Sequence, residues 1–222
     1  MTALILPETN KHMGEVKEGK LFDLPHLWHT LFDPNVGTTF IITLIFFLAF
    51  ACAILYGFQP FTLNILKINQ SQNAMLFTVF GVVGLISQTY LVGYATKMLG
   101  MKKAFMTGLI FTSTSFIMMF FSKTIWLFVI ASIVLGIFNS IVQTLLPTIL
   151  SQETDEKSQG SVMGLNASYQ SIGMIFGPIL GGFVASAFSI PMTFLVGALL
   201  VLICFMLSFR VLRPVPKPES AF

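Results

Sequence analysis

The sequence predicts an all-α, polytopic membrane protein with six transmembrane helices arranged as a 3+3 inverted repeat. Composition is the first observation behind this fold class: 55% of the 222 residues are hydrophobic and 9% are charged, whereas a soluble domain carries about 25% charged residues. The placement of charge is the second, because between Ile68 and Gln152 the only charged side chains are four lysines. The apolar runs on either side of these lysines are long enough to cross a bilayer, which takes about 20 helical residues.

Six spans are expected between residues 37 and 209. The stretch Ser158–Ser208 contains no charge and is too long for one span. The turn at Ser189–Pro191 divides it, because proline suits the first turn of a helix and not its interior. The six expected spans are 37–61, 74–96, 104–121, 125–150, 161–187 and 191–209.

The segments outside these spans have different characters. Residues 1–36 are interpreted as the end of a preceding helix followed by a cytoplasmic linker. Within this linker, Leu24, Leu27, Trp28 and Leu31 fall at helical spacing, so residues 21–32 are expected to form a short helix on the membrane surface. Residues 210–222 are expected to be a cytoplasmic tail.

The basic residues predict the orientation, with both termini in the cytoplasm. If the N-terminus is cytoplasmic, ten of the 12 basic residues lie on the cytoplasmic side, and only Lys67 and Lys123 lie outside. This bias follows the positive-inside rule and requires an even number of spans. The expected location is the cell (inner or plasma) membrane.

An inverted repeat is expected because three spans followed by three more must have opposite orientations in the membrane. Pro60 and Pro147 lie near the ends of the first and fourth spans, 87 positions apart. By that offset Tyr56 corresponds to Gln143. Inverted repeats of this kind are frequent in secondary transporters.

The expected spans contain no acid, base or histidine. A membrane enzyme needs such groups for nucleophilic, acid–base or metal chemistry, so enzymatic activity is not expected. Cys52 and Cys204 are interpreted as small apolar side chains, and no metal-ligand spacing or phosphate-binding glycine loop occurs. No cofactor, metal or nucleic-acid partner is expected.

Polar side chains inside the spans are the candidates for substrate contacts. Tyr56 and Gln59 lie in the first span, and Asn139 and Gln143 form an i, i+4 pair on one face of the fourth. The competing interpretation for each is a hydrogen bond between helices. Four further polar residues rank below these: Gln88, Asn166, Tyr169 and Gln170.

A stripe of small residues marks the fifth span. Gly173, Gly177 and Gly181 recur every four residues and form a smooth face on which another helix can pack closely. Pro178 lacks a backbone donor and is expected to bend this helix.

Four stretches in order resemble the C-terminal half of a major facilitator superfamily transporter, particularly its drug:proton antiporter branch. They are LILPET at 4–9, the surface helix with Asp33-Pro34, the basic loop GYATKMLGMKK at 93–103, and SQGSVMG at 158–164 leading into GMIFGPILGG. The resemblance implies half of a twelve-helix fold, with the first and fourth spans lining a central cavity.

The basic loop departs from the family pattern of glycine, acid, base, glycine and bases. Gly93, Gly100 and Lys102 match, with Lys103 also basic, but Lys97 stands where the family has an acid. In the family this loop helps to lock helices through charge pairs. The departure leaves topology and helix locking as the expected roles of the loop.

The resemblance implies transport of small molecules, as the C-terminal half of an alternating-access efflux transporter. The implied partners are a small-molecule substrate, the lipid bilayer and an N-terminal six-helix half. An acid that couples transport to protons would lie in that other half, because these spans contain none. The alternative is a non-transporting truncated or scaffold module that assembles with itself or with another chain.

Overall fold

The computed structural model describes residues 31, 36–154 and 158–211, and over these residues the chain is helical without any strand. The linker, the surface helix and the tail predicted from the sequence lie largely outside the described residues. The helices are α2 (Gly37–Phe50), which continues through π-helical stretches at Ala51–Phe58 and Phe61–Ile65, α3 (Gln70–Ile86), a π-helical stretch at Ser87–Leu91 leading into α4 (Val92–Leu99), α5 (Met101–Phe121), α6 (Ile125–Gln152), α7 (Gln159–Ala187) and α8 (Met192–Ser208).

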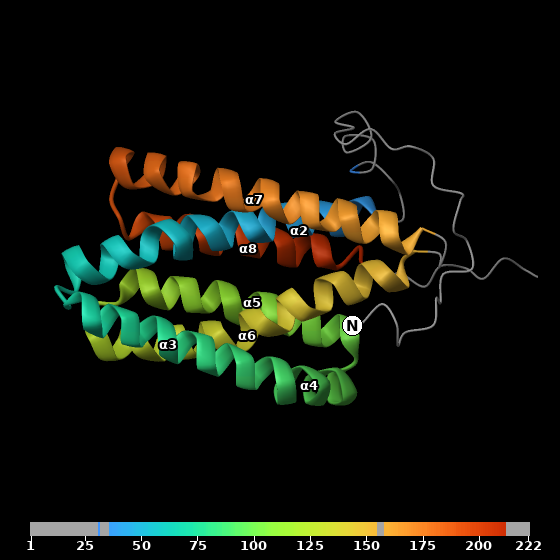
Figure 1. Cartoon of the computed structure of the whole chain (residues 1–222), viewed down its shortest axis with the longest axis horizontal. Helices are drawn as coiled ribbons and strands as arrows, with labels where there is room; N and C mark the ends of the chain where they lie inside the picture. Colours follow the sequence, from blue (N-terminus) through green and yellow to red (C-terminus); the bar gives the residue numbers. More distant parts are fainter. Residues whose placement is uncertain (1–30, 32–35, 155–157, 212–222) are drawn as a thin grey trace, which may run out of the picture.

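The predicted all-α fold class is confirmed, with helix ends close to those expected. Within the described residues five continuous helices are long and apolar enough to cross a membrane, and α8 is a shorter apolar helix of 17 residues. The helices lie side by side along the long axis of the molecule, joined by turns at alternate ends (Figure 1).

Local sequence explains several of the turns. Asn69 begins α3 with a capping box, in which its side chain accepts from the Gln72 N–H at 2.8 Å and the Gln72 side chain accepts from the Asn69 N–H at 3.1 Å. Gly100 separates α4 from α5 with a φ of +79°, a conformation that favours glycine. Pro191 precedes the first residue of α8.

The first helix of each half of the chain packs against helices of the other half. Helix α2 packs against α7 and α8, and α6 packs against α3 and α5, while α5 and α8 contact each other between them. Figure 1 shows α2, α7 and α8 on one side of the bundle, and α3, α5 and α6 on the other. Exchanging α2 with α6, α3 with α7 and α5 with α8 leaves this set of neighbours unchanged, as an inverted repeat requires.

Close contacts of glycines give the register of the repeat. A Cβ on Gly84 of α3 would lie 3.7 Å from the carbonyl oxygen of Gly136 on α6, and a Cβ on Gly173 of α7 would lie 3.0 Å from the Cβ of Phe47 on α2. Gly173 lies 89 positions after Gly84, and Gly136 lies 89 positions after Phe47. The two contacts are therefore counterparts.

A second pair of contacts gives the same offset. A Cβ on Gly108 of α5 would meet the side chain of Val142 on α6 at 2.8 Å, and a Cβ on Gly197 of α8 would meet the Cβ of Ala53 on α2 at 3.0 Å. Gly197 follows Gly108 by 89 positions, and Val142 follows Ala53 by 89. The same offset of 89 residues therefore relates the α3–α6 crossing to the α2–α7 crossing, and the α5–α6 crossing to the α2–α8 crossing.

The offset of 87 expected from Pro60 and Pro147 is therefore wrong for the body of the repeat. The physical reason lies in the π-helical stretch Ala51–Phe58, which has no counterpart in the wholly α-helical α6. A π-turn holds one more residue than an α-turn, so the offset falls beyond this stretch, toward the value set by the prolines.

The stripe of small residues on α7 packs on α2. A Cβ on Gly173 would lie 2.8 Å from the Leu44 carbonyl oxygen, and one on Gly177 would lie 2.9 Å from the Leu48 carbonyl oxygen. A Cβ on Gly181 would lie 3.0 Å from the Cβ of Tyr56. Only glycine allows the two backbones to approach this closely. Helix α7 runs through Pro178 without interruption, and a bend there stays a prediction.

Burial differs sharply between the helices. In an apolar 18-residue stretch of each long span, the buried share is 17% in Gln70–Leu99 and 22% in Gln159–Ala187, against 50–61% in the other three. The two poorly buried helices, α3 and α7, are counterparts in the repeat and lie at opposite edges of the bundle (Figure 1). The bundle therefore has two symmetry-related uncovered edges.

Replacing Gly177 by alanine is expected to destabilise the bundle. The new methyl group would overlap Ala51 Cβ and press on the Leu48 carbonyl, and overpacking of this kind costs about 1–3 kcal/mol. Unfolding of the purified chain in mixed micelles measures the change. Gly164→Ala in the same helix is the matched control, because nothing lies within 4 Å of that position. Equal stability of the two variants would contradict the close contact.

Candidate functional site

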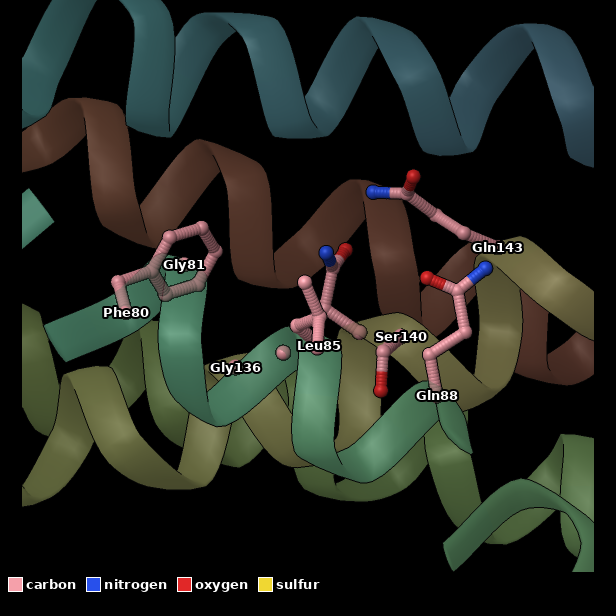
Figure 2. A pocket seen from close by; sticks show the side chains of 9 residues that line it. Phe80, Gly81, Leu85, Gln88, Gly136, Ser140 and Gln143 are labelled. Atoms are coloured by element: carbon pink, nitrogen blue, oxygen red, sulfur yellow. The ribbon is translucent and has the colours of Figure 1, made fainter. Parts of the chain in front are cut away.

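An open cavity of about 420 Å³, with polar and apolar groups in its wall, lies between α3 and α6. It is lined by apolar, small and amide side chains from both helices and from the π-helical stretch after α3 (Figure 2). The lining residues are Phe80, Gly81, Gly84, Leu85, Gln88, Gly136, Asn139, Ser140 and Gln143.

Glycines, which have no side chain, create much of this space. Three of the nine lining residues are glycines, two on α3 and one on α6. Where the helices meet, Ser87 and Ser140 both donate to the Ile137 carbonyl oxygen, at 2.9 and 2.7 Å. The Ser87 bond holds the π-helical stretch against α6, whereas the Ser140 bond lies within α6. Gln88, the next residue after Ser87, lines the cavity.

Three amides supply the polarity of the cavity. Asn139 is 5% exposed, and its Oδ1 has no hydrogen-bond partner among the described residues. Gln143 lies one turn further along α6, and Gln88 faces it from across the cavity, with both amide groups visible in Figure 2. These groups can donate and accept hydrogen bonds without carrying charge.

No charged side chain lines the cavity. Within the described part of the chain, every acidic or basic side chain lies in a connection or in the first or last turn of a helix: Lys67, Lys97, Lys102, Lys103, Lys123, Glu153 and Arg210. The middle of the bundle therefore offers hydrogen bonds but no ion pairs.

The structure does not bring the four leading candidates together. Asn139 and Gln143 share the cavity, as their spacing on one helix face suggests. Tyr56 instead lies beside Gly181 and Gly182 of α7, and Gln59 is exposed near the end of the first span. A contact of any of them with substrate stays a prediction.

The lower-ranked candidates also separate. Gln88 lines the cavity, whereas Asn166 accepts a hydrogen bond from Thr43 at 3.2 Å in the α2–α7 contact. Tyr169 is buried against Phe40 there, with ring centroids 4.9 Å apart. Gln88 could have been ranked higher from Gly81 and Gly84, since the three fall on one side of a helix at spacings of three and four.

Comparison with known proteins identifies the family of this chain. Residues 39–222 match the Major Facilitator Superfamily. The chain belongs to this superfamily. It is accordingly a multi-pass membrane protein of a family whose members are transporters rather than enzymes.

Several relatives are named as drug-resistance proteins of bacteria. The chain is 28% identical over 147 residues to multidrug resistance protein MdtG of Escherichia fergusonii, covering 66% of this chain and 36% of the relative. It is 28% identical over 129 residues to the class C tetracycline resistance protein of Escherichia coli, covering 57% and 32%. Multidrug resistance protein 1 of Bacillus subtilis is 25% identical over 187 residues, covering 84% and 48%. The chain thus spans about a third to a half of these relatives.

A solved structure shows the same fold. The human organic anion transporter MFSD10 superposes with a TM-score of 0.71 at 16% identity, over 78% of this chain and 40% of that one. The superfamily fold predicted from the sequence resemblance is therefore confirmed.

The basic loop at 93–103 joins two helix ends. Lys102, in the first turn of α5, donates through Nζ to the carbonyl oxygens of Phe209 and Val211, at 3.1 and 2.7 Å. These carbonyls follow α8, where a cation also interacts favourably with the helix dipole. Gly93, Lys97 and Lys103 are exposed. One lysine of the loop thus ties the third span to the sixth.

A second hydrogen bond joins α2 to α6 at the same end of the bundle. Thr39, in the first turn of α2, donates to the carboxylate of Glu153 at 2.7 Å, just after the end of α6. The first helices of the two repeats are therefore linked directly, and a negative charge lies near the N-terminus of α2.

Replacing Lys102 by methionine is expected to loosen the end of α8. Methionine keeps the length of the apolar stem but removes the donors to Phe209 and Val211. Amide hydrogen exchange of residues 207–211 should become faster in the variant, while α5 stays protected. Lys103→Met is the matched control, because Lys103 is exposed and its neighbour makes the helix contact. Equal exchange in the two variants would argue against this tie.

Proposed function

We propose that this chain acts as the C-terminal six-helix half of a secondary transporter that moves small molecules across the cell membrane by alternating access. Its relatives are named for multidrug and tetracycline resistance, which supports an efflux direction. The basic residues favour a cytoplasmic location for both termini. The partner would be an N-terminal six-helix half.

The observation that carries this proposal is a mismatch between burial and hydropathy. Helices α3 and α7 are the least buried, yet the spans containing them are less apolar than those of the well-buried α2 and α6. A helix surrounded by lipid on most sides should be among the most apolar of the bundle. These two edges are therefore suited to another protein surface or to a water-filled path.

The cavity lies beside one of these edges. Its polar residues, Gln88, Asn139 and Gln143, would be poorly placed against lipid tails, since an unpaired amide there is costly. If a second half covered α3 and α7, the cavity would become part of an enclosed path between the halves. Substrate would then contact both halves, as alternating access requires.

The alternative is a scaffold module in which the same edges pair with a second copy of this chain. The uncovered edges favour association, but they fit a different six-helix half and a second copy of this chain equally well. The native mass of the purified chain distinguishes them: a stable homodimer supports the scaffold, whereas irregular aggregation supports a half that needs a different partner.

The chain by itself is expected to show no proton-driven transport. Its spans contain no carboxylate that could carry a proton during alternation, and its path is bounded on one side only. Proteoliposomes containing the purified chain, given an imposed pH gradient, should accumulate a fluorescent dye no faster than empty liposomes. Robust uptake driven by the gradient would contradict the proposal.

Association of the purified chain is expected to use the α7 edge. Ile179 is 63% exposed there, and replacing it by serine should shift the detergent-solubilised chain toward the monomer in light scattering. Ile203→Ser is the matched control, because Ile203 is 47% exposed on α8, away from both edges. A chain that is monomeric before any substitution, or an equal effect of the two variants, would count against a docking edge.

A further inference from the structure

An apolar groove of about 390 Å³ runs along α8. Its lining side chains are all apolar, and all come from α8: Leu199, Leu202, Ile203, Met206 and Leu207. Their spacings of three and four place them on one side of the helix. Four of the five are exposed, from 43% for Leu202 to 63% for Met206. Because α2 and α5 cover other sides of α8, the groove faces the lipid around the bundle.

Arg210 lies at the end of this groove. Positions 199, 203, 206 and 210 follow one another at spacings of four, three and four, so Arg210 continues the lining side just beyond the last residue of α8. The Arg210 N–H donates to the Leu207 carbonyl oxygen at 2.9 Å, so the chain still turns as a helix there. The Arg210 side chain is exposed. One end of the groove therefore carries a guanidinium.

Lys102 brings a second positive charge to the same point. Its Nζ donates to the carbonyl oxygens of Phe209 and Val211, on either side of Arg210. An ammonium group has three donors, so one is left for another acceptor. Glu153, the only acid in the described part of the chain, lies after α6 and accepts a hydrogen bond from α2. The two cations after α8 are thus available to an anion.

The length of the groove matches one leaflet of a bilayer. Leu199 and Arg210 are 210 − 199 = 11 residues apart, which corresponds to about 16 Å along a helix. One leaflet contributes about half of a hydrocarbon core that is roughly 30 Å thick. A phospholipid whose acyl chain lay in the groove would therefore hold its phosphate at the level of Arg210. A guanidinium can bind a phosphate through two parallel hydrogen bonds.

A second apolar groove, on the α7 edge, lacks this charge. Its volume is about 440 Å³, and its lining residues are Leu48, Phe176, Ile179, Leu180 and Phe183. Helix α7 contains no basic residue, so a lipid there would find no cation on that helix. Of these two grooves, the α8 groove alone continues into a cation on its own helix. Charge therefore distinguishes it from an ordinary lipid-facing surface.

We propose that this side of α8 binds one anionic phospholipid, with an acyl chain in the groove and the phosphate at Arg210 and Lys102. The site goes beyond the proposed function and does not rest on it, because binding requires only that the chain is in a membrane. The expected cytoplasmic location of both termini would place the phosphate in the cytoplasmic leaflet, where anionic lipids attract basic residues.

The test compares two phospholipids that have the same acyl chains and different headgroups. The full chain in detergent is titrated with phosphatidylglycerol or with phosphatidylcholine, and native mass spectrometry measures the affinity of the first bound lipid. Phosphatidylglycerol is expected to bind about fivefold more tightly, since one basic residue near an anionic headgroup contributes about this factor. Excess glycerol phosphate should not displace it, because it has no acyl chain. This comparison needs no variant and is independent of any folding defect.

Arg210→Gln is expected to weaken phosphatidylglycerol binding about fivefold and to leave phosphatidylcholine binding unchanged. Lys123→Gln is the matched control. It removes the same charge from an exposed position beyond the opposite end of α5, a helix of 21 residues and therefore about 30 Å long. This control should retain the preference for phosphatidylglycerol.

Three results would overturn the proposal. The first is equal affinity for the two lipids. The second is an equal loss in the two variants, which would indicate attraction to the positive charge of the whole chain. The third is displacement by glycerol phosphate, which would indicate an anion site without a lipid. Failure of the proposed function looks different, because the lipid preference would remain while no transport was found with any partner half.

Discussion

The close approach of helices at glycine positions is the contact on which the rest of this bundle depends. Lipid tails are as apolar as leucine, so helices in a membrane associate through packing rather than through the hydrophobic effect. Gly173 and Gly177 bring the backbone of α7 onto α2, and Gly84 and Gly136 bring α3 and α6 together. These crossings join helices from different repeats, so neither three-helix repeat could form its native contacts alone. The same crossings leave α3 and α7 at the edges, each covered on one side only.

The cavity follows from the same small residues. At Gly173, Gly177 and Gly181 of α7, the space that a side chain would take is occupied by the backbone and side chains of α2 and its π-helical continuation. On α3 the corresponding contact is looser, since a Cβ on Gly84 would lie 3.7 Å from the Gly136 oxygen and a Cβ on Gly81 would have no neighbour within 4 Å from another part of the chain. One symmetric fold therefore produces a tight crossing at one edge and a polar cavity at the other. The difference places the candidate binding wall on the α3 side, among the amides of Gln88, Asn139 and Gln143.

The sequence predicted most of the fold, because membrane spans are marked by long apolar runs whose limits are charges and prolines. It also identified the α7 stripe, since three glycines at a spacing of four are visible in one span. The register of the repeat was not accessible in this way: Gly84 and Gly136 are single glycines whose pairing appears only when α3 and α6 meet. The site was predicted in part. Asn139 and Gln143 share a helix face, so their spacing located them together, whereas Gln88 and Gln59 are each the single amide of their expected spans. Which of those two reaches a cavity depends on the neighbouring helix and on the π-helical turns at Ala51–Phe58 and Ser87–Leu91, which change the direction of later side chains.

The distribution of charge separates the contacts that hold the helix ends together from the cavity. Charged side chains of the described residues are confined to the helix ends, where Lys102 binds the carbonyls after α8 and Glu153 accepts from Thr39 of α2. Both contacts hold helices together at one face of the membrane, and neither lies in the cavity lining. A wall with amides but no carboxylate can form neutral hydrogen bonds, but it cannot gain and lose a proton near neutral pH. Recognition and energy coupling are thus separable here. Under the proposed function, a group that couples transport to protons would belong to the other half, because the described spans contain no carboxylate.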